Sequence, residues 1–177
     1  MPSQAFTERL RTQIANEFAA AQQYIAVAIY YDAETLPRLA GFFYAQALEE
    51  RNHAMMMIQY LLDAGEEAPV PGVREPRSGF ADVAEPVTIA LEQERKVSDQ
   101  IAELAGLARE GGDYQSEQFM QWFLKEQVEE VSTMSDLLKV VQRGKDNPLL
   151  VEEYLAREHQ GNDGEDPTAP PVAGGAA

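Results

Sequence analysis

Carboxylate, amide and imidazole side chains recur near the middle of four long apolar patterns in this chain. These side chains belong to Glu17, Glu50, His53, Glu94, Gln127 and Glu130. A carboxylate inside a helical bundle is costly unless it is paired, protonated or bound to a cation. Four segments that each place such a group at mid-length therefore indicate one shared site. A metal ion is the simplest way to neutralise that site.

Glu50 and His53 form a Glu-x-x-His motif. At positions i and i+3 of a helix, both side chains project from the same face. Carboxylate with imidazole suits iron, manganese or zinc. The motif is weak alone, because a surface acid and a core histidine explain the two residues singly. Its register with the acids of the other three segments makes the metal interpretation stronger.

The four patterns that carry these residues have helical spacing. Apolar residues recur at steps of three and four, which keeps one face of a helix turned to a core. We expect an all-α bundle, with helices over 4–33, 37–65, 83–109 and 113–143. Pro37 suits a first helical turn, and Asp113 can cap the fourth helix.

The segment 65–82 decides the topology. It is rich in Pro and Gly, so we expect a loop. A helix of about 27 residues is roughly 40 Å long, and 18 extended residues reach up to about 60 Å. The loop can therefore cross the full length of the bundle and leave the third helix parallel to the second.

Composition limits the partners. Lys and Arg number 14 against 30 Asp and Glu, a net charge of −16. This favours cations and argues against nucleic acid and anionic membrane surfaces. With no Cys, disulfides and thiolate metal sites are excluded. We see no secretory signal or bilayer-spanning run, and expect a cytoplasmic protein.

The C-terminal part divides into two pieces. Pro148 opens an expected fifth, short helix over 148–159. Residues 161–177 are mainly Gly, Pro and Ala with three acids. We expect this tail to be disordered and dispensable for assembly, since it has almost no bulky apolar residues.

Three segments carry a resemblance to a known family. NEFAAAQQY, QALEERNHA and QFMQWFLKEQVEEV resemble the bacterial non-haem ferritins. The resemblance implies a ferritin-like di-iron domain over 1–160, with a long crossover and a short fifth helix. It also implies a homo-oligomeric shell of 24 subunits, which oxidises Fe(II) with oxygen or peroxide and stores the ferric mineral.

The resemblance also implies roles for individual residues. Glu17, Glu50 and His53 would hold a first iron, and Glu50 would bridge to a second iron held by Glu94 and Glu130. Gln127 would lie beside the pair of irons, and Tyr24 would donate a hydrogen bond to a ligand.

A second acidic set lies one residue before the core positions: Glu49, Glu126 and Glu129. One helical step turns each side chain by about 100°, so these acids lie beside the core. A solvated charged face would explain them equally well. In bacterial ferritins such acids form a third iron site on the cavity side, which this pattern resembles. Trp122 shares a face with Glu126 and could report on nearby iron.

The chain departs from the haem-binding bacterioferritins at two places. Those proteins carry a second Glu-x-x-His on the fourth helix, where this chain has Gln127 and Glu130. They bind haem through a Met directly after the second helix's ligand Glu, and here that residue is Arg51. We therefore expect no haem.

Two other functions stay open. One is a di-iron oxygenase or peroxidase of rubrerythrin type, although without Cys the chain has no rubredoxin-like electron-transfer site. The other is a structural bundle without metal, which metal analysis of the purified protein would separate.

Overall fold

Five helices form the protein in a computed structural model that describes residues 2–158 and 166–175. No strand occurs in the described part of the chain. The helices are α1 (Gln4–Ala33), α2 (Pro37–Asp63), α3 (Glu85–Glu110), α4 (Tyr114–Arg143) and α5 (Leu149–Glu158). The predicted all-α fold is confirmed.

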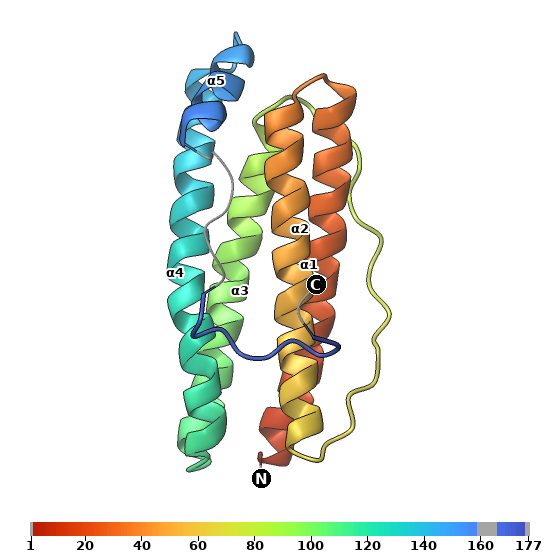
Figure 1. Cartoon of the computed structure of the whole chain (residues 1–177), viewed down its shortest axis with the longest axis vertical. Helices are drawn as coiled ribbons and strands as arrows, with labels where there is room; N and C mark the ends of the chain where they lie inside the picture. Colours follow the sequence, from red (N-terminus) through yellow and green to blue (C-terminus); the bar gives the residue numbers. More distant parts are fainter. Residues whose placement is uncertain (1, 159–165, 176–177) are drawn as a thin grey trace.

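The long loop crosses the bundle as predicted. α1 and α2 form one antiparallel hairpin, and α3 and α4 form the other (Figure 1). The loop after α2 runs along the outside from one end of the bundle to the other, so α3 is parallel to α2. α5 lies at the end of the bundle where α4 finishes.

Local sequence signals define the helix ends. The Ser3 side chain accepts a hydrogen bond from Phe6 N at the start of α1, and that of Asp113 accepts from Ser116 N at the start of α4. Both satisfy backbone donors that a first turn leaves unpaired. α2 ends at Asp63 rather than residue 65, because Gly65 has a φ of 75°, a left-handed conformation that ends helices.

The apolar core consists of two clusters. One lies near the α5 end, where Tyr24, Tyr31, Phe43, Leu137 and Val151 are all buried. The other lies near the N-terminus and is built around residues that include Phe6, Leu10, Met57, Ile101 and Phe123. In all four long helices, the predicted ligand positions fall between the two clusters along the chain. These positions, Glu17, Glu50, His53, Glu94, Gln127 and Glu130, thus form a polar layer between two apolar clusters.

The described part of the tail contacts the bundle. Residues 166–175 run across the front of Figure 1 from α4 to α2. Ala169, Val172 and Ala173 pack against the second apolar cluster. The expectation of disorder therefore does not describe this segment, because small apolar side chains fit a surface that is already apolar. Residues 159–165 and 176–177, including His159, lie outside the described residues.

Within the described part of the chain, no helix is long and apolar enough to cross a membrane.

Candidate metal centre

Glu17, Glu50 and His53 come together in the middle of the bundle. Each can offer one ligand atom such that all three atoms lie within 4.8 Å of one another. His53 Nδ1 lies 3.8 Å from Glu50 Oε2. The exposed fractions are 1%, 0% and 4%. The two residues from α2 share a face because they are three positions apart, and α1 supplies the third from the neighbouring helix.

Several oxygens in this layer lack a hydrogen-bond partner within the described residues. They are Glu17 Oε2, both carboxylate oxygens of Glu50, and Glu94 Oε2. A buried polar atom left without a hydrogen bond costs roughly 1–3 kcal/mol, and more when it is charged. Carboxylate oxygens beside an imidazole form a donor set that suits a divalent transition metal. The unpartnered oxygens therefore fit a bound cation.

The burial and close spacing of these acids raise their pKa values. Burial, as the largest cause, raises the pKa of Glu17, Glu50 and Glu130 well above the ordinary value. Repulsion adds to it, from Glu50 on Glu17 and from Glu94 on both Glu50 and Glu130. Acids that disfavour one another's charge hold protons until a cation replaces them.

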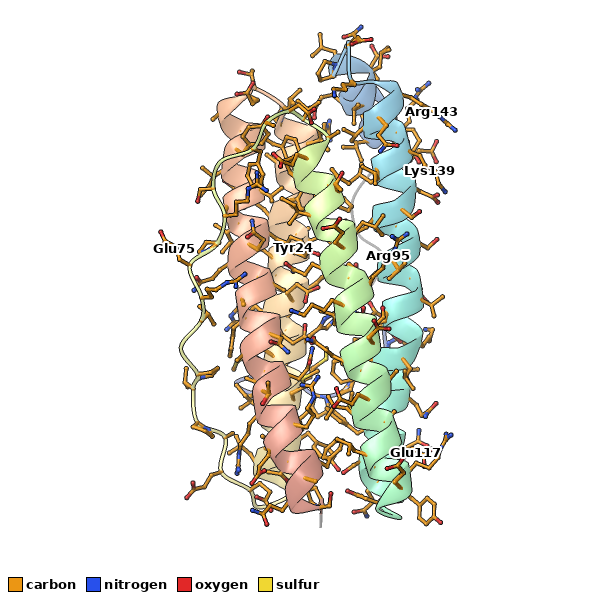
Figure 2. All side chains as sticks on the ribbon, turned by 180° about the vertical axis from the view of Figure 1, so that it is seen from behind. Tyr24, Glu75, Arg95, Glu117, Lys139 and Arg143 are labelled. Atoms are coloured by element: carbon orange, nitrogen blue, oxygen red, sulfur yellow. The ribbon has the colours of Figure 1, made fainter. Side chains whose placement is uncertain are left out.

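Glu94 joins the layer from α3. Burial raises the pKa of Glu94 to about 7, although a hydrogen bond from the Tyr24 hydroxyl lowers it. Figure 2 shows Tyr24 inside the bundle at mid-height. Gln127 is also buried, and its Oε1 accepts a hydrogen bond from the Ser98 hydroxyl at 3.0 Å. Tyr24 and Gln127 therefore lie in the polar layer beside the buried acids.

The outer acids lie in a different environment. Glu49 and Glu129 are exposed, and Glu126 is partly buried. Burial raises the pKa of Glu126, while His53 lowers it and Glu129 raises it again. Glu49 in turn raises the pKa of both Glu50 and Glu130. The outer acids therefore border the buried layer, and the structure does not gather them into one compact ligand group.

Two polar residues of the layer were missed by the sequence patterns. The amide of Gln13 is buried and donates to Glu17 Oε1 at 2.8 Å. The Ser98 hydroxyl donates to Glu94 O at 2.9 Å as well as to Gln127. Both lie one helical turn from a predicted site residue on the same helix, so a search at i±4 would have found them.

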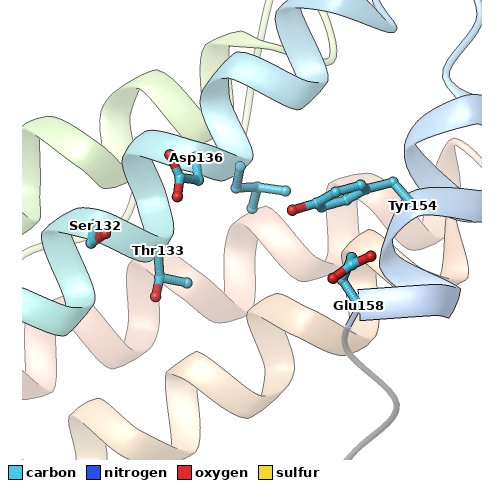
Figure 3. Close-up of a pocket in the computed structure, with 6 residues that line it drawn as sticks. Ser132, Thr133, Asp136, Tyr154 and Glu158 are labelled. Atoms are coloured by element: carbon cyan, nitrogen blue, oxygen red, sulfur yellow. The ribbon is translucent and has the colours of Figure 1, made fainter.

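A surface hollow lies away from this centre. It has a volume of about 250 Å³ and lies between α4 and α5 (Figure 3). Its lining comprises Ser132, Thr133, Asp136, Leu137, Tyr154 and Glu158. None of the predicted ligands lines it, so it belongs to a separate surface.

The fold and the polar layer define a four-helix bundle with a buried, carboxylate-rich centre whose Glu and His side chains could hold a metal ion. The sequence of residues 7–144 matches the ferritin family, described as a ferritin-like domain. The chain is 51% identical to ferritin BfrB of Mycolicibacterium smegmatis, over 97% of this chain and 94% of that protein. It is 35% identical to a bacterial non-heme ferritin of Staphylococcus aureus, over 91% and 96%. An open-pore ferritin of Archaeoglobus fulgidus superimposes with a TM-score of 0.83 at 26% identity, over 88% and 98%.

This chain belongs to the ferritin family. The resemblance found in the sequence is confirmed, including its likeness to bacterial non-haem ferritins.

Proposed function

We propose that this protein is an iron-storage ferroxidase that oxidises Fe(II) in the polar layer and retains ferric mineral inside a closed shell. The observation that carries the proposal is the buried group of Glu17, Glu50 and His53, with carboxylate oxygens that lack partners. In a ferritin-family chain, iron is the cation that fits this group. Iron is substrate here, and each Fe(II) gives up one electron.

The layer contains enough ligand side chains for two metal ions. Glu17, Glu50 and His53 hold the first, and Glu50 bridges to a second held by Glu94 and Glu130. Repulsion from Glu94 and Glu130 raises the pKa of Glu50, and repulsion from Glu94 raises the pKa of Glu130, which supports this because such repulsion requires proximity. Two Fe(II) side by side deliver a pair of electrons to oxygen or peroxide, which avoids one-electron products.

Tyr24 and Gln127 support the ligands in this proposal. Tyr24 donates to Glu94, which leaves that carboxylate's other oxygen for metal. The Ser98 hydroxyl fixes the amide orientation of Gln127. Such partners hold ligands in place and typically change metal affinity or activity by about 10–100-fold when removed.

The outer acids would serve a third iron. The charges of His53 and Glu129 affect the pKa of Glu126. The charge of Glu49 affects the pKa values of Glu50 and Glu130. Their greater exposure suits an ion that arrives or leaves, rather than one that must be held in the dry layer.

Exposed apolar side chains support assembly. Ile25, Ile29, Tyr44 and Leu48 are 42–56% exposed on the α1–α2 hairpin. Leu149 and Leu150 are 63% and 53% exposed on α5. Apolar surface of this kind marks an interface, and closed symmetric assemblies bury it. We expect 24 copies of the 19.6 kDa chain, about 470 kDa. A monomer or dimer at micromolar concentration in native mass spectrometry would contradict the shell.

Replacement of His53 tests the oxidation centre. In stopped-flow absorbance with two Fe(II) per subunit, His53→Ala should slow the first fast phase at least about tenfold, because a direct ligand is lost. Asn52→Ala, the neighbouring change on α2, should keep the wild-type rate. Wild-type protein that binds no Fe(II), or a His53→Ala variant with an unchanged fast phase, would refute the proposed ferroxidase.

A further inference from the structure

The tail segment 166–175 forms a strap across two helices. At one end, Asp166 Oδ2 accepts a hydrogen bond from Trp122 Nε1 on α4 at 3.0 Å. At the other end, Ala173 N donates to the Met55 carbonyl oxygen on α2 at 3.2 Å. Between these contacts, Ala169 and Val172 pack against the apolar cluster below the metal centre. The strap is thus tied to both α2 and α4.

The backbones of the two helices that the strap joins do not approach each other closely, and the helices meet through side chains such as the stacked rings of Tyr60 and Phe119. α1 packs against α2, α3 packs against α4, and α1 approaches α3. Among the described residues, α2 and α4 show no comparable backbone approach. The strap therefore crosses the seam between the helix that carries Glu50 and His53 and the helix that carries Trp122 and Glu126.

Trp122 links the strap to the metal centre. Its ring lies edge-to-face against the His53 ring, with centroids 5.6 Å apart and an interplanar angle of 74°. Phe123 contacts the same imidazole at 5.8 Å and 78°. These ring contacts orient the imidazole, and its Nδ1 lies 3.8 Å from Glu50 Oε2.

Asp166 is built to hold the indole in one orientation. Its other oxygen, Oδ1, accepts from Thr168 N at 2.8 Å and from Thr168 Oγ1 at 2.7 Å. Its carboxylate is therefore fixed by its own turn before it meets Trp122. An indole anchored through Nε1 cannot turn over without breaking that hydrogen bond. Lys125 lies 3.9 Å from the same carboxylate, but that ion pair is exposed and contributes little.

We propose that Asp166 is a positioning residue for the metal centre, because it fixes the Trp122 indole and so sets the orientation of the His53 imidazole. The proposal rests on the proposed function, in which His53 is a metal ligand. It assigns the tail a role at the oxidation centre, whereas composition alone predicted a disordered tail that is dispensable for assembly.

A pair of variants at residue 166 separates geometry from charge. Asp166→Ala removes the acceptor for the indole, whereas Asp166→Asn keeps an acceptor oxygen and removes the charge. Trp122→Phe keeps a ring beside His53 and removes the indole N–H. Asp166→Ala in the Trp122→Phe background then asks whether Asp166 acts through the indole. Pro171→Ala, at an exposed position on the same strap, serves as the matched control.

Two readouts report geometry without turnover. Trp122 is the only tryptophan in the chain, so its emission and its quenching by acrylamide follow the indole directly. Co(II) binding, followed by its visible absorption bands, reports the geometry and affinity of the metal centre. We expect Asp166→Ala to raise quenching, shift the Co(II) bands and weaken Co(II) binding by about threefold to tenfold, at or below the usual cost of losing a supporting partner.

The remaining variants sharpen the expected outcome. Asp166→Asn should restore the Co(II) bands and the affinity, and Pro171→Ala should match wild type. In the Trp122→Phe background, Asp166→Ala should add no further weakening. The Fe(II) oxidation rate should follow the Co(II) affinity.

Three results would overturn the proposal. The first is a looser indole in Asp166→Ala with Co(II) affinity unchanged within twofold. The second is an equal loss of affinity in the Trp122→Phe background. The third is wild-type protein that binds neither Co(II) nor Fe(II), which refutes the proposed function as well. In the first two results the wild type still binds metal, so only the positioning role fails.

Discussion

Glu94→Gln tests how much the buried acids cost the metal-free protein. Glu94 is fully buried, and one of its oxygens has no partner within the described residues. Glutamine has nearly the same shape, and its carbonyl oxygen can still accept the hydrogen bond from Tyr24. The change removes one ionisable group, together with its repulsion on Glu50 and Glu130.

The magnitude follows from the pKa of Glu94, which rises from 4.5 to about 7 on folding. The folded state holds the proton more tightly than the unfolded chain, so ionisation opposes folding as the pH rises through this window. A shift from 4.5 to about 7 corresponds to about 3 kcal/mol once both states are ionised. The stabilising effect of Glu94→Gln should be about 1 kcal/mol at pH 5 and about 3 kcal/mol at pH 8.

Guanidinium unfolding of chelator-treated protein measures this effect. The series should run from pH 5 to pH 8 at a fixed protomer concentration, because assembly alters apparent stability. Glu92→Gln, a change at an exposed acid on the same helix, should follow the wild-type curve. Added Zn(II) should stabilise wild type more than Glu94→Gln, since a ligand is lost. A difference between Glu94→Gln and wild type that stays constant from pH 5 to pH 8 would refute the reasoning.

Two further predictions concern the outer acids and haem. Glu126→Ala combined with Glu129→Ala should keep the first fast phase of Fe(II) oxidation and change the iron-to-oxygen ratio or later turnover, because these acids border the buried layer. Oxygen-electrode and stopped-flow measurements check this, and loss of the first phase would reverse the assignment of the two acidic sets. Protein expressed with ample haem should show no stoichiometric Soret band, because the Arg51 guanidinium cannot ligate haem iron. A bis-Met haem spectrum would contradict that prediction.

The spacing of the apolar residues predicted the helices, because packing against the core requires that spacing. Each apolar stripe faces one core, so the 3.6-residue repeat is present in the sequence itself. The predicted helix boundaries agree with the structure to within two residues. The crossover was also predictable, because the length of the loop and the length of the helices fix what the connection can span.

The supporting groups could not be predicted in the same way. Helical spacing places Gln13 one turn from Glu17 and Ser98 one turn from Glu94, but the apolar pattern does not mark either residue. Only the packing of α3 against α4 shows that Ser98 also contacts Gln127. The contacts of residues 166–175 could not be predicted for a related reason. Composition shows that residues 166–175 cannot form a core of their own, but it does not show an apolar surface already available beside Trp122 and Met55.

Charge balance connects the cost of the layer to its proposed use. Four ionised glutamates, at positions 17, 50, 94 and 130, carry four negative charges, and two Fe(II) carry four positive ones. A layer that is neutral only when both ions are bound must otherwise hold protons, which agrees with the raised pKa values of all four acids. In the proposed function, iron uptake therefore has to displace protons. Because burial is the largest cause of all four shifts, the dry apolar clusters on either side of the layer make its acids both costly without metal and selective for cations.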